Sequence, residues 1–353
     1  MDLFFIILSL LLILLSILPF VKNQHWFFRI PEFIKTQIFF LQIVAIIGLV
    51  IFTQKSLLFY LVLIIQSILL FYHAYILSRF TNFYKKKNSA TKSIKDIKII
   101  SANIYQYNNK FQKFKDLIKK EKPDIFFTIE SNKDWENAMR DLETDYKFTE
   151  KITLENTYGM HLYSKIPFEK ITTHFFVAKD LPSIEAHFKD KEGNHFVVFC
   201  AHPPPPSPTE EKTSKERDGD LMCIAKRIKE MKQPVIVVGD FNTVAWSKIA
   251  KLFRKNCGLI DGRIGRGILA SYHAKYWLFR APLDLVFHSK EIILKQLNIL
   301  EYIGSDHFPI RCVFSVTPSN ITKEKKVETL SKEEKNNVET YIKKGKETNS
   351  QNR

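Results

Sequence analysis

Two side chains that could do chemistry, Asp240 and Asn242, stand at the end of an apolar run. The run covers residues 235–238, follows Pro234 and is stopped by Gly239, a pattern typical of a buried strand. Because alternate residues of an extended chain point to one face, Asp240 and Asn242 leave the strand together at its rim. A carboxylate can orient a water and a carboxamide can donate to a charged oxygen. The pair therefore indicates hydrolysis of a phosphate ester.

A second polar pair, Asp306 and His307, directly precedes the apolar run of residues 309–316. This position predicts another rim, at the start of a strand. The GDFN sequence of residues 239–242 and the SDH sequence of residues 305–307, in this order, resemble the two most diagnostic motifs of the endonuclease/exonuclease/phosphatase superfamily. That superfamily includes pancreatic deoxyribonuclease, apurinic endonucleases, inositol polyphosphate phosphatases and neutral sphingomyelinases.

Two further polar residues end the first predicted strands of the same region. Residues 97–104 read as a strand that carries Asn103, a Lys-rich helix follows from residue 111, and the strand of residues 125–129 ends on Glu130. The resemblance places Asn103 and Glu130 on the metal side of the site. Mg²⁺ prefers oxygen ligands and usually takes one or two carboxylates while it keeps several waters. The resemblance thus implies Mg²⁺ or Mn²⁺ at Glu130, with Asn103 and Asp306 as further metal-site residues.

The resemblance also assigns the remaining catalytic positions. His202 ends the return strand of a hairpin over residues 188–201 and precedes a run of four prolines, and Asp284 lies in the apolar stretch 282–287. In the implied mechanism Asp240 orients and deprotonates the attacking water, and Asn242 donates to the phosphoryl oxygens. His307, oriented by Asp284, binds the phosphate or transfers a proton, and His202 contacts the phosphate from the other side.

Three apolar runs, residues 3–21, 36–53 and 57–77, precede this region. Each is close to the roughly 20 residues that cross a bilayer, so we expect three transmembrane helices. A signal peptide is the alternative for the first run, but it lacks a basic start and a small-residue cleavage site. Flanking Lys and Arg residues favour a cytoplasmic catalytic domain, with an exported domain as the rival. The polar residues Gln42, Gln66 and His73 inside the runs favour hydrogen bonds between helices.

The 353-residue chain therefore divides into four segments. Residues 1–80 hold the helices, 81–95 form a basic linker, 96–316 form the catalytic domain, and 317–353 form a charged tail that is expected to be disordered or partly helical. By resemblance the domain is a four-layer α/β sandwich, two packed β-sheets flanked by helices. The four cysteines show no metal-binding spacing, so ordinary buried thiols are expected, with a disulfide as the open alternative.

Charge and aromatic residues bear on the substrate. The net charge of +16 fits a phosphate-rich partner, either nucleic acid or an anionic membrane, and equally a solvated Lys-rich surface. Basic and aromatic residues interleave over residues 263–280, which suits nucleic acid, lipid headgroups or an ordinary surface. A helix over residues 209–231 is expected to expose Arg217, as a phosphate ligand or a solvated side chain.

Taken together, the sequence predicts a membrane-anchored, metal-dependent phosphoesterase. Its expected partners are the lipid bilayer and a phosphate-ester substrate, either a nucleic acid or a lipid phosphodiester, with a phosphomonoester as a further possibility. The alternative from another class is a membrane-bound protein that binds phosphorylated ligands without turnover.

Overall fold

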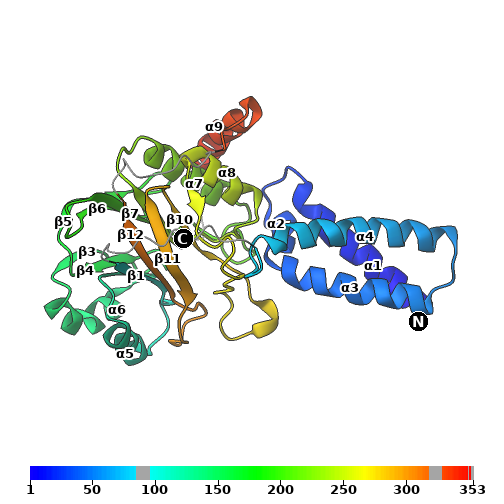
Figure 1. Cartoon of the computed structure of the whole chain (residues 1–353), viewed down its shortest axis with the longest axis horizontal. Helices are drawn as coiled ribbons and strands as arrows, with labels where there is room; N and C mark the ends of the chain where they lie inside the picture. Colours follow the sequence, from blue (N-terminus) through cyan, green and yellow to red (C-terminus); the bar gives the residue numbers. More distant parts are fainter. Residues whose placement is uncertain (85–95, 318–327, 349, 351–353) are drawn as a thin grey trace.

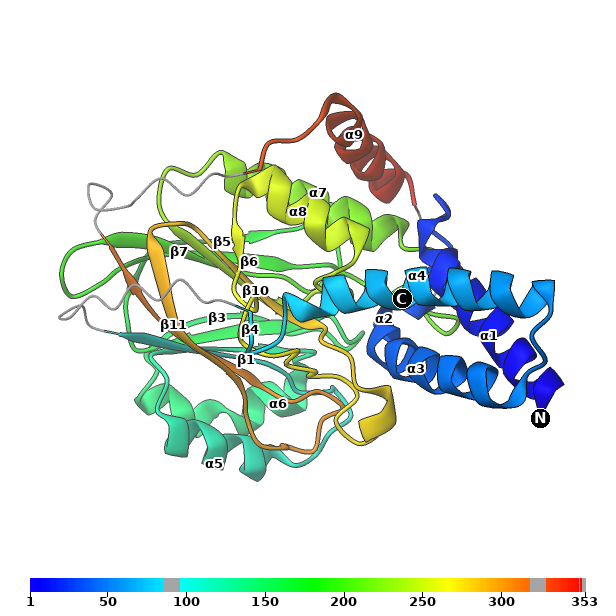
Figure 2. The same ribbon diagram turned by 45° about the vertical axis from the view of Figure 1, so that its right-hand side comes forward.

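The computed structural model describes residues 1–84, 96–317, 328–348 and 350. Two six-stranded sheets pack face to face and form the centre of the main body. Helices α7 (Lys215–Lys229) and α8 (Lys248–Cys257) cover one sheet, while α5 (Phe111–Glu121) and α6 (Lys133–Ala138) cover the other (Figure 2). The predicted four-layer sandwich is confirmed. A bundle of N-terminal helices extends from one end of it (Figure 1).

The first sheet delivers the metal-side residues to one edge. Its order is β11 (Ile292–Ile299), β12 (Ile310–Val316), β1 (Ile97–Asn103), β2 (Ile125–Ile129), β4 (Met160–Ser164) and β3 (Phe148–Ile152). Strands β1 and β2 are parallel, with Asn103 opposite Ile129. Because parallel neighbours end at the same edge, Asn103 and the following Glu130 emerge side by side.

The second sheet delivers the other half of the site. Its order is β5 (Phe168–His174), β6 (Ser183–Lys189), β7 (His195–Cys200), β8 (Val235–Asp240), β10 (Asp284–His288) and β9 (Ile260–Asp261). Strand β8 is parallel to β7 and antiparallel to β10, and Asp284 pairs with Asp240 in the register. The ends of β7 and β8 and the start of β10 therefore meet at one edge. β6 and β7 form the expected hairpin.

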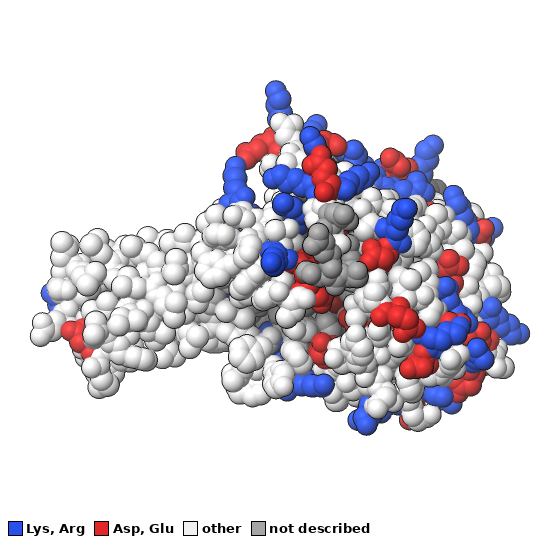
Figure 3. Space-filling view, turned by 180° about the vertical axis from the view of Figure 1, so that it is seen from behind, with Lys and Arg blue, Asp and Glu red and all other residues white. Residues whose placement is uncertain are grey.

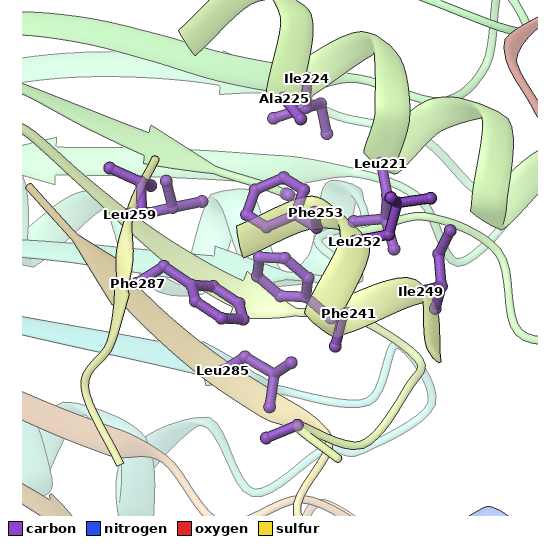
Figure 4. Packing of buried hydrophobic residues seen from close by; sticks show 14 of the residues in the cluster. Leu221, Ile224, Ala225, Phe241, Ile249, Leu252, Phe253, Leu259, Leu285 and Phe287 are labelled. Atoms are coloured by element: carbon purple, nitrogen blue, oxygen red, sulfur yellow. The ribbon is translucent and has the colours of Figure 1, made fainter. Parts of the chain in front are cut away.

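Aromatic packing against α8 fixes the GDFN turn, residues 239–242. Phe241 is fully buried under α8, and its ring lies 5.4 Å from that of Phe253 and 5.3 Å from that of Phe287 (Figure 4). Phe241 directly follows β8, so its side chain and that of Asp240 leave on opposite faces. Packing of this phenylalanine thus sets the direction of Asp240.

Three N-terminal helices are long and apolar enough to cross a membrane, over Asp2–Phe20, Lys35–Phe52 and Leu57–Ser78. These bounds lie close to the predicted runs and correspond to α1 (Asp2–Ile17) with η1 (Leu18–Phe20), α3 (Lys35–Phe52) and α4 (Leu57–Ser78). The face of the bundle seen in Figure 3 is nearly free of charged side chains.

Inside the bundle, polar groups join the helices. Gln42 Nε2 donates to Ser16 Oγ at 3.2 Å, and Gln42 Oε1 lies 2.9 Å from His73 Nδ1. This arrangement agrees with the expectation that the polar residues within the apolar runs form hydrogen bonds between helices. Gln66 is the exception, since its buried amide has no hydrogen-bond partner within the described ranges.

The bundle is bonded directly to the sandwich through main-chain and side-chain groups. The segment before α2 (Trp26–Phe33) runs against the segment before α7, where Trp26 N donates to Lys212 O at 3.0 Å. Trp246 Nε1 donates to Glu32 O at 2.8 Å, and Gly265 N donates to Arg79 O at 2.9 Å. Three separate regions of the domain thus hold the helices. Most of the predicted basic linker, residues 85–95, lies outside the described residues.

Part of the tail folds. Residues Lys332–Glu347 form α9, which begins with a capping box in which the Ser331 hydroxyl accepts from Glu334 N and the Glu334 side chain accepts from Ser331 N. α9 packs on α7, where Gly345 meets Gly219 so closely that a Cβ built on Gly345 would lie 2.8 Å from the Gly219 Cα. Of the expected outcomes for this tail, the partly helical one applies to the described part.

The glycine contact generates the first prediction. Replacing Gly345 by Val places a branched side chain against the α7 backbone, which we expect to weaken the docking of α9 by about 1–3 kcal/mol. Trypsin should then remove the tail faster than from the unmodified full-length protein. Asn336→Val introduces the same side chain at an exposed position of α9 and serves as the control. Equal cleavage rates for the two variants would contradict the packing role of Gly345.

Candidate active site

One oxygen, Asp240 Oδ2, lies at the centre of the predicted site. Asn103 Nδ2 donates to it at 3.2 Å, His307 Nε2 lies 3.5 Å away and His202 Nε2 lies 3.9 Å away. These four residues come from β1, β8 and the loops that follow β7 and precede β12. All four are buried. Residues from both sheets therefore converge on a single carboxylate.

The GDFN turn has a geometry that few residues tolerate. Gly239 has φ 139°, and a Cβ there would lie 2.1 Å from Ala201 O, so only glycine lets β7 and β8 approach. Asn242 has the left-handed φ of 48°, and its N–H donates to Asp240 Oδ1 at 2.9 Å. One amide N–H of Asn242 donates to Pro203 O at 2.9 Å. Within the described residues the second N–H has no acceptor, so it can make the donation that the sequence predicts.

His307 is held on both sides of its ring by carboxylates. Its Nδ1 lies 2.8 Å from Asp284 Oδ2, the partner that the sequence predicts, and its Nε2 faces Asp240. Burial alone would lower the pKa of His307, but the charges of Asp240 and Asp284 outweigh it and raise the pKa to about 10. The ring is therefore an imidazolium at neutral pH. Tyr272 packs on it at a centroid distance of 4.8 Å.

His202 has the opposite charge state. Burial lowers its pKa to about 4, against the charge of Asp240, so the ring is neutral at pH 7. The Tyr158 ring lies against it at 5.3 Å. Its Nδ1 is buried without a hydrogen-bond partner among the described groups, a condition that a water or a bound ligand would relieve. The site thus pairs one cationic imidazole with one neutral imidazole.

The metal side is centred on Glu130, which has the left-handed φ of 69°. Its Oε1 accepts from Asn103 Nδ2 at 2.7 Å and its Oε2 from Gln106 N at 3.1 Å. Burial raises the pKa of Glu130 to about 8, and the charge of Asp306 also raises it, while the Asn103 hydrogen bond opposes the rise. A nearby cation would stabilise this carboxylate.

These residues fit a hard cation with few protein ligands. In the described ranges no group of three or more His, Cys, Asp and Glu side chains is arranged as a metal cluster. Mg²⁺ needs only one or two carboxylates, because it keeps several waters. Glu130 and Asp306 can supply them. The amide nitrogen of Asn103 faces Glu130 and its Oδ1 accepts from Tyr105 N at 3.0 Å, so in this arrangement Asn103 orients the carboxylate.

Two functional contacts differ from the sequence analysis or were missed by it. Arg217, expected at an exposed helix start, is buried, because Asp218 Oδ1 accepts from its Nη2 at 2.7 Å and Asn242 O accepts from its Nη1 at 3.0 Å. It holds the GDFN turn and does not face solvent. Ser305 was overlooked: its Oγ donates to Asn103 O at 2.8 Å and accepts from His307 N at 3.0 Å. A hydroxyl two residues before the histidine was the available signal.

This convergence agrees with comparisons to known proteins. The model of the Endonuclease/Exonuclease/phosphatase family matches residues 100–307, which is more than half of the chain. The chain belongs to this family. Members of the family are hydrolases that act on phosphate ester bonds, and they generally depend on a divalent metal. No curated protein matches the sequence.

Solved structures of family members share the fold. D. rerio TDP2, complexed with a single-strand DNA product, is 16% identical and aligns over 63% of this chain and 99% of its own, with a TM-score of 0.52. The human nocturnin catalytic domain is 19% identical over 63% and 94% of the two chains, with a TM-score of 0.52. The mannosyl-6-phosphatase from Bacteroides thetaiotaomicron is 16% identical over 62% and 100%, with a TM-score of 0.50. The match to the family model begins at residue 100, so the N-terminal helices lie outside the family domain.

The carboxylates around His307 generate the second prediction. Asp284→Asn keeps an acceptor near Nδ1 but removes its charge, so the pKa of His307 should fall below about 10. NMR titration of histidine-labelled protein, assigned with His307→Gln, measures the change. Glu169→Gln, at the exposed partner of His195, should leave His307 unaffected. A wild-type His307 that titrates near its ordinary pKa would contradict the assignment.

The same shift sets a pH dependence of stability. A histidine with a raised folded-state pKa stabilises the fold fully below the unfolded value of about 6.5, and this stabilisation is lost as pH rises through the folded value. Wild-type protein should therefore exceed Asp284→Asn in thermal stability most at pH 6, and the difference should shrink as pH approaches 10. A constant difference over this range would argue against the linkage.

Proposed function

We propose that this protein is a membrane-anchored, divalent-metal-dependent phosphoesterase that hydrolyses its substrate by in-line attack of water. Residues 96–316 carry the catalysis and the helices of residues 1–80 hold the domain at a bilayer. The observation that supports this most directly is the sharing of Asp240 Oδ2 by Asn103, His307 and His202. A carboxylate held among donors, at the rim of the sheets, is suited to orient a water.

In the proposed reaction, Asp240 accepts a proton from the attacking water while the oxygen of that water bonds to phosphorus. The bond from phosphorus to the leaving oxygen breaks, and that oxygen takes up a proton from solvent to give an alcohol, while Asp240 releases its proton to solvent. His307, an imidazolium between Asp240 and Asp284, binds the negative phosphoryl oxygens. The second amide N–H of Asn242, which does not bond to Pro203 O, donates to the same group. His202 contacts the phosphate through its neutral ring.

A divalent cation held by Glu130 and Asp306, with Asn103 orienting Glu130, would neutralise the phosphate and the charge that develops on the leaving oxygen. This choice of residues rests on the fit described above. Gln106 N and Asn103 keep the Glu130 carboxylate aimed into the site before any ligand binds.

The proposed topology puts the first loop and the catalytic domain on one side of the bilayer, because the two are bonded to each other. Lys22, Arg29 and Lys35 flank the spans on that side, and Arg79 follows the third. This excess of positive charge favours the cytoplasmic side.

The fourth prediction tests catalysis. His307→Ala and Asp240→Asn should each lower hydrolysis of a soluble ester, bis-p-nitrophenyl phosphate or p-nitrophenyl phosphate, by about a thousandfold in the full-length protein with Mg²⁺ or Mn²⁺. His195→Ala, at an exposed histidine of β7, should retain activity. Near-normal turnover by both site variants would show that the site is misassigned. Absence of turnover in the wild type would remove the proposed activity.

The fifth prediction concerns the metal. Chelation with EDTA should abolish turnover, and readdition of Mg²⁺ or Mn²⁺ should restore it. Glu130→Gln should raise the Mn²⁺ concentration needed for half-maximal activity, and should weaken Mn²⁺ binding measured by calorimetry, by about tenfold or more. Glu150→Gln, on β3, serves as a carboxylate control. Unchanged binding by Glu130→Gln would exclude Glu130 as a ligand.

A further inference from the structure

Four consecutive large side chains project from the domain into the surroundings. Tyr276, Trp277, Leu278 and Phe279 are 60%, 73%, 54% and 63% exposed. They form the tip of the loop between β9 and β10, which contains η3 (Trp277–Phe279). A contiguous apolar tip of this kind in a soluble domain indicates a surface that another apolar phase covers. We call residues 276–279 the apolar tip.

The apolar tip lies level with the domain-side end of the candidate membrane spans. Gln37 Nε2 donates to Leu278 O at 2.8 Å and to Arg280 O at 3.2 Å. Gln37 is two residues past Lys35, where α3 begins, which corresponds to about 3 Å along the helix axis. Figure 1 shows the tip, in yellow, beside that end of α3. The hydrogen bonds therefore fix its main chain at the depth where the proposed bilayer begins.

The residues around the tip have the composition of a membrane interface. Lys275 and Arg280 flank the four apolar residues on both sides. Arg280 stacks on Phe308 at 4.8 Å, and Lys275 Nζ lies 6.0 Å from the Tyr105 ring centroid. Aromatic residues with adjacent basic groups prefer the boundary between lipid tails and headgroups. Because the tip is hydrogen-bonded to the candidate membrane span α3, a bilayer around that span would also cover the tip.

The base of the same loop forms part of the candidate active site. Tyr272 packs on His307, and Ala274 N donates to Asp306 O at 2.6 Å. Tyr272 N also donates to Ala281 O at 2.9 Å, which closes the loop between its base and its tip. The SDH motif is thus bonded to the base of the loop whose tip is apolar, so one short loop connects the candidate site to the proposed headgroup level.

We propose that the apolar tip inserts into the bilayer and that the site takes its phosphate ester from a membrane phospholipid of the adjoining leaflet. This inference rests on the proposed phosphoesterase function and names its substrate class. A lipid phosphate already lies at the depth of Lys275 and Arg280. A nucleic acid, in contrast, would have to lie against an apolar tip and an anionic membrane surface. Water adds to phosphorus, and a lipid alcohol or a headgroup alcohol leaves with a proton.

Insertion can be measured without activity. The full-length protein is reconstituted into phosphatidylcholine vesicles that contain brominated lipid, and tryptophan quenching is compared between wild type and Trp277→Phe. Trp277 is one of four tryptophans, so the difference between the two proteins isolates its signal. We expect the Trp277 component to be quenched by bromines near the headgroups. A component quenched only by a water-soluble reagent would overturn the insertion.

Substrate choice is tested with a matched pair of variants. Trp277→Asp with Phe279→Asp makes the tip polar, while Trp277→Leu with Phe279→Leu keeps it apolar. On vesicles of phosphatidylcholine, phosphatidylglycerol and phosphatidic acid, the Asp pair should release headgroup or phosphate about tenfold more slowly than the Leu pair. Both should hydrolyse bis-p-nitrophenyl phosphate at the wild-type rate.

The outcomes separate the two proposals. Suppose that the wild type hydrolyses the soluble ester and that this activity depends on His307. If the vesicle lipids then stay intact, or if plasmid DNA is nicked in a His307-dependent way and lipids are not hydrolysed, the lipid assignment is overturned and the phosphoesterase is retained. Equal lipid hydrolysis by the Asp and Leu pairs would overturn the role of the tip. If the wild-type protein does not hydrolyse the soluble ester, the proposed function itself is wrong.

Discussion

The sharing of one buried carboxylate oxygen by three groups is the constraint on which the arrangement of the domain depends. Asp240 Oδ2 can meet Asn103, His307 and His202 only if the ends of strands in both sheets lie at the same edge. Burying a carboxylate is costly unless hydrogen bonds and opposite charge compensate, and here an amide and an imidazolium do so. The packing of Phe241, the absence of a Cβ at Gly239 and the buried Arg217 all maintain the turn that carries this oxygen.

Within each half of the site, contacts outside the reacting atoms hold the functional residues in place. Ser305 connects the end of β1 to the main chain of His307, and Asp284 sits opposite Asp240 in the register of β8 and β10. Consequently a small shift of one sheet against the other would separate the imidazole from both of its carboxylates. The cores between and outside the sheets therefore determine the electrostatics of the site as well as the stability of the fold.

The motifs allowed the positions of most site residues to be predicted from sequence, because a polar residue that ends a buried strand must lie at the edge of the sheet. Asn103, Glu130, Asp240 and Asp284 all lie where their strands predict. Arg217 could not be placed, since its burial depends on Asp218 and on a carbonyl of Asn242 that is distant in sequence. Nor could the docking of α9, which depends on the approach of two glycines. The exposure of residues 276–279 could not be predicted either, because large apolar and aromatic residues usually indicate a buried core.

The main-chain hydrogen bonds between the helical bundle and the sandwich have a consequence for motion. Trp26, Ser214 and Gly265 each donate through their backbone N–H, to Lys212, Gln24 and Arg79. Such joints do not depend on side-chain identity. Because the Gly265 bond lies in a different segment from the two bonds between residues 24–26 and 212–214, rotation about either joint strains the other. In the proposed membrane-anchored state, the domain would therefore be a rigid attachment with a fixed reach. With the proposed lipid substrate, its encounters would be governed by lateral diffusion in two dimensions, and the rate would follow the mole fraction of that lipid in the membrane.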